Sequence, residues 1–166
     1  MTLLQVIQAI ERVAAKQPSV NTIVRENVFL LNENPAARYG VFSWSQNQHG
    51  ESISTDYRTY RFTFFYVDRL TESKGNAVEC QSVGIETLGN IIRELGEVLP
   101  VSDWAVDVFR DRFADECAGA YCSVTLQALR GSACWEDFPE FYEGDVNNDF
   151  NDDFLRWKAK EVAIIK

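Results

Sequence analysis

The stretch Thr59-Tyr60-Arg61-Phe62-Thr63-Phe64-Phe65-Tyr66 decides the fold of this chain. Within it Tyr60, Phe62, Phe64 and Tyr66 recur at every second position, which is the spacing of one face of a β-strand. Aromatic side chains pack well on a pleated, half-buried surface. We therefore expect a strand here whose aromatic face covers the core of the domain.

Other strands are expected on both sides of this stretch, at residues 23–31, 39–46, 104–109 and 121–129. In the last of these, Cys122, Val124, Leu126 and Ala128 alternate with polar residues, so one face of that strand should be buried. The turn Asn32-Glu33-Asn34-Pro35 should separate the first two strands.

Residues 46–55 are polar and are expected to form a connection. This connection would hold His49, the only histidine of the chain, in a hairpin loop.

Two helices are expected. Thr2 followed by Gln5 has the pattern of a capping box, and apolar residues recur at helical spacing until Gln17-Pro18. A longer amphipathic helix should run from Ala77 towards Pro100, with glycines that allow close backbone packing. Strands, a helix and strands again predict an α+β fold: a mostly antiparallel sheet packed by the N-terminal helix and the long helix.

A C-terminal arm, residues 131–166, should follow the domain at residues 1–130. Between Gly131 and Arg156 there is no lysine or arginine, although carboxylates are frequent, and the chain has a net charge of -9. Acidic tails that stay solvated usually lack aromatic residues, whereas this arm contains many. We expect it to dock on a neighbouring subunit or partner, or back on its own domain. The predicted interface residues are Trp135, Phe138, Phe141, Tyr142, Phe150, Phe154 and Trp157.

No catalytic residue is predicted. A Ser-His or Cys-His pair would have to use His49, and no serine or cysteine near it in sequence has the setting of a nucleophile elbow. The glycines are scattered rather than gathered into a phosphate-binding loop. A small enzyme that uses His49 or a cysteine is one functional hypothesis, and the two others are given below.

Metal and cofactor sites are not predicted either. Asp145-Val146-Asn147-Asn148-Asp149 resembles the start of a calcium loop, but the sixth position is Phe150 instead of glycine and the twelfth is Arg156 instead of glutamate. The spacing of Cys117 and Cys122 does not match a zinc site. Without an export signal, reduced thiols are expected for all four cysteines, and a small hydrophobic role for Cys122.

The charge balance also bears on partners. Affinity for phosphates comes mainly from clustered Lys and Arg, so direct binding to DNA or RNA is not expected of a chain this acidic. The N-terminal residues form neither a signal sequence nor a membrane span. A cytoplasmic protein without membrane contact is expected.

Three segments resemble a known group of proteins: residues 60–72, Gln81-Ser82 with Ile91-Ile92-Arg93, and residues 113–121. They look like small structural proteins of tailed bacteriophages, particularly of the crAss-like and other Bacteroides phages, with the layout of tail terminator or tail completion proteins. The resemblance covers roughly residues 1–130 and leaves out the arm.

The resemblance implies a virion protein, made in the host cytoplasm, that forms a homo-oligomeric ring in the neck or tail. Its partners would be copies of itself and the adjacent portal-side and tail-side proteins. Carboxylates facing the lumen would let genome DNA pass without specific binding. The alternative is a soluble acidic inhibitor or DNA mimic that occupies a basic cleft of a host enzyme.

Overall fold

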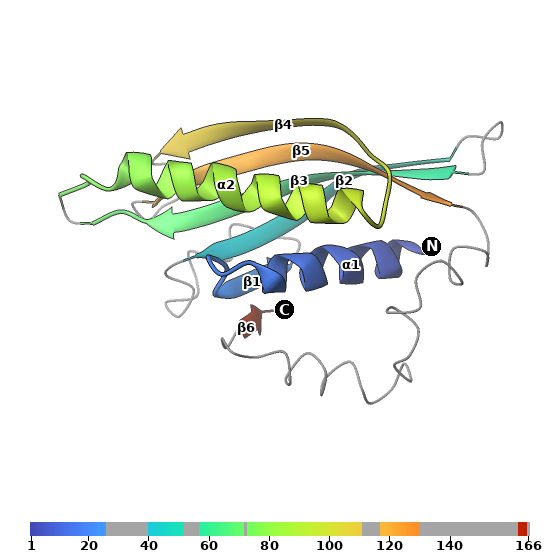
Figure 1. The fold of residues 1–166 in the computed structure, drawn as a ribbon, viewed down its shortest axis with the longest axis horizontal. Coiled ribbons are helices and arrows are strands. Elements are labelled where there is room, and N and C mark those ends of the chain that lie inside the picture. Colours follow the sequence, from blue (N-terminus) through green and yellow to red (C-terminus); the bar gives the residue numbers. More distant parts are fainter. Residues whose placement is uncertain (26–39, 52–56, 72, 111–116, 130–162, 166) are drawn as a thin grey trace.

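In a computed structural model of the chain, residues 1–25, 40–51, 57–71, 73–110, 117–129 and 163–165 are described, and they form an α+β fold (Figure 1). The elements are α1 (Leu3–Lys16), β1 (Thr22–Arg25), β2 (Val41–Glu51), β3 (Tyr57–Arg69), α2 (Ala77–Gly96), β4 (Val101–Arg110), β5 (Cys117–Leu129) and β6 (Ala163–Ile165). Both helices lie on the same face of the sheet (Figure 1).

The sheet has the strand order β4-β5-β3-β2-β1-β6. β3 lies inside it and pairs antiparallel with β2 and with β5, and β4 pairs antiparallel with β5. β1 pairs in parallel with both β2 and β6. The expectation of a mostly antiparallel sheet packed by two helices is therefore confirmed, with a parallel section at one side.

The aromatic face of β3 is at the centre of the main core, as the period-two pattern predicts. Tyr60, Phe62, Phe64 and Tyr66 are all almost completely buried. On β2, Phe42 packs against Phe64 with ring centroids 5.5 Å apart, and Trp44 packs edge-on against Phe62 at 6.0 Å. Cys122, Val124, Leu126 and Ala128 of β5 are buried in the same cluster, and Cys122 has the small hydrophobic role expected of it.

The other face of the sheet carries a smaller cluster. Val24, Val41, Val67 and Phe109 are buried there, and the rings of Phe65 and Tyr121 stack with centroids 6.2 Å apart. These residues alternate with the core residues of the same strands, as a pleated sheet requires.

α1 begins with the expected capping box. The Thr2 side chain accepts a hydrogen bond from the Gln5 backbone N–H at 3.4 Å, and the Gln5 side chain accepts one from the Thr2 backbone N–H at 2.7 Å. The helix ends at Lys16, immediately before Gln17-Pro18. Gln17 then reaches α2, because its Nε2 donates to Glu94 Oε1 at 2.8 Å.

α2 approaches β5 closely at one glycine. A Cβ on Gly84 would lie 2.9 Å from the Ala120 backbone nitrogen and 3.2 Å from a ring carbon of Tyr66. The expectation that helix glycines permit close packing is confirmed at this position. At Gly89 nothing lies within 4 Å of such a Cβ, so Gly89 does not serve the same purpose.

The prediction that residues 46–55 form a loop is wrong over the first part of this segment. β2 continues to Glu51, with a bulge between Gln46 and Gln48, and His49 pairs with Tyr60 as a strand residue. Polar cross-strand contacts support this extension: Asn47 Nδ2 donates to Thr63 Oγ1 at 2.5 Å, and Arg61 donates to Gln48 Oε1 at 3.3 Å. A search for apolar alternation misses a strand that is extended by polar pairs.

Other boundaries differ less. β4 and β5 each begin several residues before the predicted strands, and α2 ends at Gly96, short of Pro100. The first predicted strand is described only as β1, because residues 26–31 and the turn at 32–35 lie outside the described residues.

The two glycines of α2 give a matched test of the packing. Gly84→Ala should lower the free energy of unfolding by about 1–3 kcal/mol, because the added methyl group meets backbone that cannot move away. Gly89→Ala should raise it by about 0.5–1 kcal/mol through helix propensity alone. Urea denaturation followed by circular dichroism measures both changes, and equal effects of the two substitutions would contradict the close approach of α2 to β5.

Candidate interaction surface

The predicted interface residues Trp135, Phe138, Phe141, Tyr142, Phe150, Phe154 and Trp157 all lie outside the described part of the chain. Docking of the arm therefore stays a prediction. Of the arm, the structure describes Ala163–Ile165, the strand β6, which pairs with β1 of the same chain. Residues 145–156, which were not expected to bind calcium, and Cys134 also lie outside the described residues.

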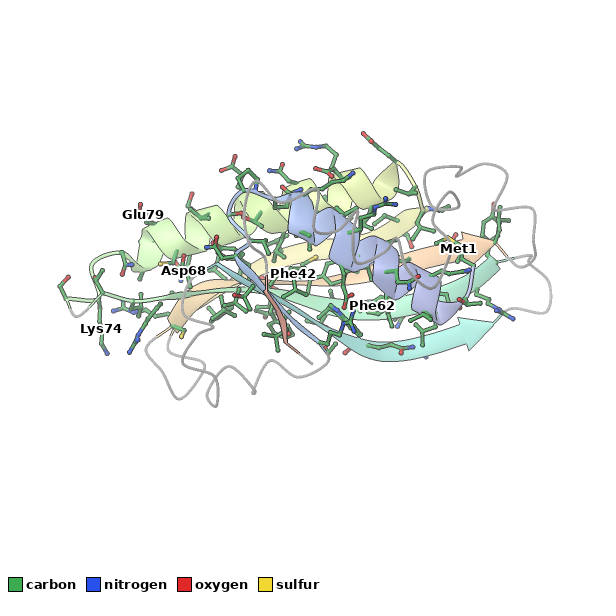
Figure 2. All side chains as sticks on the ribbon, turned by 90° about the horizontal axis from the view of Figure 1, so that it is seen from below. Met1, Phe42, Phe62, Asp68, Lys74 and Glu79 are labelled. Atoms are coloured by element: carbon green, nitrogen blue, oxygen red, sulfur yellow. The ribbon has the colours of Figure 1, made fainter. Side chains whose placement is uncertain are left out.

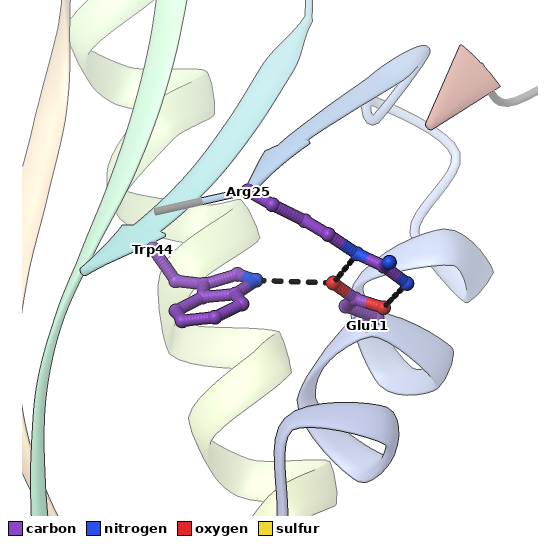
Figure 3. Close-up of polar contacts among 3 residues, drawn as sticks. All are labelled: Glu11, Arg25 and Trp44. Atoms are coloured by element: carbon purple, nitrogen blue, oxygen red, sulfur yellow. Dashed lines mark hydrogen bonds and ion pairs between the residues drawn. The ribbon is translucent and has the colours of Figure 1, made fainter. Parts of the chain in front are cut away.

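A partly buried ion pair that sequence patterns did not reveal joins α1 to the parallel section of the sheet (Figure 3). Arg25 of β1 donates two hydrogen bonds of 2.6 Å to the two carboxylate oxygens of Glu11 on α1. The indole Nε1 of Trp44 on β2 donates to the same carboxylate at 3.3 Å. Glu11 is only 4% exposed. A buried carboxylate with three donors is held as a structural anchor, and these bonds fix β1 beside β2.

A pocket of about 230 Å³ lies where β3 ends and α2 begins. Its lining residues are Asp68, Arg69, Leu70, Thr71, Asn76, Glu79, Cys80 and Val83. Figure 2 places Asp68 and Glu79 at the same end of the molecule as Lys74. Lys74 belongs to the turn that joins β3 to α2. The pocket contains the only described carboxylate whose pKa shifts clearly and one of the buried thiols, which makes it a candidate site of chemistry.

Burial raises the pKa of Asp68 above its usual range, although hydrogen bonds from the backbone N–H groups of Arg69 and Gly40 oppose this effect. Burial also raises the pKa of the Cys80 thiol, and the charges of Asp68 and Glu79 raise it further. Burial raises the pKa of the nearby Tyr66 phenol, which donates to the backbone oxygen of Ser19 at 3.3 Å.

These shifts suit packing better than catalysis. The thiolate is the reactive form of cysteine, and sites that use it lower the pKa of the thiol with positive charge. Cys80 has the opposite surroundings, and burial raises the pKa of Cys122 to about 11. Cys80 and Cys122 are free thiols. Among the described residues no group of three His, Cys, Asp or Glu side chains could hold a metal ion.

A third region lies along β4, at one end of the sheet. Four apolar side chains there are exposed: Trp104 (52%) and Val108 (47%) on β4, and Val78 (76%) and Ile85 (46%) on α2. We call these four residues the β4 surface. Single exposed apolar residues are common, but a group of them that includes a tryptophan is typical of an interaction site.

Val78 and Ile85 of α2 lie on the same side of the molecule as Val108 of β4. Gln81 Nε2 donates to the backbone oxygen of Phe109 at 3.1 Å, so this flank of α2 faces β4. Val78 and Ile85 are three and four residues from Gln81 and therefore lie on the same flank. On β4, Val108 pairs with Ala120, the residue directly beneath Gly84 of α2. Val108 is thus on the helix-covered face, next to that flank.

A β-bulge presents the tryptophan. Ser102 pairs with Thr125 and Ala105 with Ser123, so Asp103 and Trp104 together stand opposite the single residue Val124. Asp103 has φ = 52°, a left-handed conformation that such bulges use. Bulges re-aim side chains at the edges of sheets, and here the result is a half-exposed indole.

Comparisons with known proteins assign no family: no family model and no curated protein matches the chain. Of the described helices, neither is long and apolar enough to cross a membrane.

The raised pKa of Asp68 predicts a pH dependence of stability. A carboxyl group whose pKa is higher in the folded state binds its proton more tightly there. Its contribution to the free energy of unfolding is therefore present at low pH and is lost as the pH rises through the pKa of the folded state. The substitution Asp68→Asn removes this titration. Relative to the Asp68→Asn variant, the unsubstituted protein should therefore become less stable as the pH rises from about 3 towards neutrality.

Urea denaturation of both proteins at several pH values measures the difference in unfolding free energy. A difference that stays constant with pH, or that grows in favour of the unsubstituted protein as the pH rises, would contradict the assignment of a desolvated carboxyl group at Asp68.

Proposed function

We propose that this chain is a structural subunit of a ring in the neck or tail of a tailed bacteriophage, where it acts by self-association and by docking to adjacent ring proteins. The observation that carries the proposal is the β4 surface at one end of an open sheet, together with the resemblance of residues 1–130 to tail terminator and tail completion proteins. The chain would reside in the virion and, during assembly, in the host cytoplasm.

The layout of the sheet supports this proposal. A ring of identical subunits needs two different surfaces on each copy, one that gives a contact and one that receives it. In the order β4-β5-β3-β2-β1-β6, the outermost described strands are β4 and β6, at opposite ends (Figure 1). Contacts made through these two edges of the sheet would repeat from copy to copy. They would form a closed ring if the rotation between neighbouring copies divides a full turn.

The distribution of charge favours the ring over the acidic inhibitor. A DNA mimic needs a dense array of surface carboxylates. The described residues instead expose both signs: Glu79, Glu86, Glu97, Asp103 and Asp107 beside Lys16, Arg61, Arg93 and Arg110. The acidic surplus of the sequence belongs mainly to residues 131–156, where aromatic residues accompany it.

Native mass spectrometry of the full-length chain tests the proposal. We expect a closed oligomer of defined stoichiometry, formed by the chain alone, that dissociates to subunits on dilution. In a virion map, this oligomer should occupy the neck or the tail.

A chain that stays monomeric at all concentrations would overturn the proposal. If such a monomer bound a host nuclease or polymerase with an affinity that falls steeply with salt, the acidic inhibitor would be the correct function.

A further inference from the structure

We propose that the β4 surface receives the β6 edge of a second copy, so that the sheet continues from one subunit into the next. This inference rests on the proposed self-association and names the two surfaces that carry it. Nothing in the resemblance specifies these surfaces, because the residues that carry it do not include β6, Trp104 or Val108.

The two strands lie at opposite edges of the described sheet. Among the described strands, β4 has one neighbour, β5, and β6 has one neighbour, β1. From Ala105 to Val108 the register of β4 with β5 is regular, so this segment can offer its outer backbone groups to a further strand. Addition of a strand to an exposed edge is a common mode of recognition, in which backbone hydrogen bonds provide affinity and side chains provide specificity.

The directions of the strands also favour this contact. β4 runs antiparallel to β5, β5 to β3, and β3 to β2, whereas β2, β1 and β6 all run the same way. β4 and β6 of one copy therefore point in opposite directions. When copies follow one another head to tail, β6 of one copy meets β4 of the next as an antiparallel pair, which hydrogen-bonds slightly better than a parallel one.

The charges near the two strands differ in sign. The exposed carboxylates near the β4 surface are Asp103 and Asp107 on β4 and Glu79 and Glu86 on α2. The segment 154–166, which contains β6, carries four bases and one acid. In sequence, pairing of β4 with β6 of a second copy would join a surface rich in carboxylates, on which Arg110 is the one base of β4, to a segment with a surplus of bases. Pairing of two β4 strands about a two-fold axis would instead bring the carboxylates of both copies together, which disfavours a symmetric dimer.

The bulge at Asp103 and Trp104 gives the contact its specificity. Bulges and charged residues on an edge strand prevent indiscriminate pairing. In β4 they stand at one end of the regular segment Ala105 to Val108. A partner strand that pairs in register with this segment would place apolar side chains against Trp104. A strand in another register would reach the bulge, where regular pairing is interrupted. Tryptophan is among the residues that most often dominate the energy of an interface.

Single substitutions at this surface test the inference. Trp104→Lys and Val108→Lys add a charge at half-exposed positions of β4, so the fold should persist while self-association weakens by about tenfold or more. The matched control is Leu4→Lys, since Leu4 is an apolar residue of α1 that is 63% exposed and lies outside the β4 surface. Native mass spectrometry over a range of concentrations measures association, and circular dichroism verifies folding.

A crosslinking experiment identifies the second surface. Asp107→Cys and Ala163→Cys chains, mixed and oxidised, should form a disulfide between positions 107 and 163 of different copies, identified by peptide mass analysis. A disulfide between two copies of position 107 would overturn the β6 contact in favour of a two-fold β4 dimer.

The outcomes separate the two proposals. If the unsubstituted chain forms a ring and both lysine variants form it equally well, the β4 contact is wrong while the ring function stands. If the unsubstituted chain forms no oligomer, both are wrong. Loss of the oligomer in the two β4 variants, its retention in Leu4→Lys and the crosslink between positions 107 and 163 together support the inference.

Discussion

Burial of the aromatic face of β3 is the constraint on which the rest of the structure depends. Tyr60, Phe62, Phe64 and Tyr66 cannot be left in water without a large free-energy cost, since each aromatic side chain buries about 150–250 Å². Placing β3 inside the sheet gives them neighbours on β2 and β5, and two helices on the same face close the core. The approach of α2 to β5 at Gly84 follows, because a larger side chain would hold the helix away from these rings.

The two edges of the sheet lie away from this aromatic core and are held by other interactions. At one end, the Glu11–Arg25 pair and the Trp44 indole tie β1 to the helix layer, and β1 in turn pairs with β6. At the other edge, β4 is the outermost described strand, and its Trp104 and Val108 side chains are half exposed. One edge of the sheet is thus anchored by a partly buried ion pair, while the other edge exposes apolar side chains.

The features predictable from sequence are those with a local cause. The capping box at Thr2 and Gln5, the alternation of β3 and β5 and the helical period of α2 each depend on residues close together in the chain, and each was found. The ion pair between Glu11 and Arg25 joins two elements by way of the fold, and no local pattern marks it. The extension of β2 through His49 depends on polar partners in β3 for the same reason.

The β4 surface, like the ion pair, could not be predicted from local sequence patterns. Trp104 and Val108 have the sequence of a buried strand, and only the position of β4 at an end of the sheet leaves them exposed. Sequence composition instead pointed to the aromatic residues of the arm, from Trp135 to Trp157, which stay a prediction. The two hypotheses are compatible, because β6 is the part of the arm that the structure places against the domain.

Amide hydrogen exchange of the full-length chain, measured at concentrations where it is assembled and where it is dissociated, tests most directly whether the sheet continues between copies. The account predicts that amides from Ala105 to Val108 exchange more slowly in the assembled state, while amides of α1 exchange at unchanged rates. Equal exchange of β4 in the two states, with protection confined to residues 131–160, would contradict it.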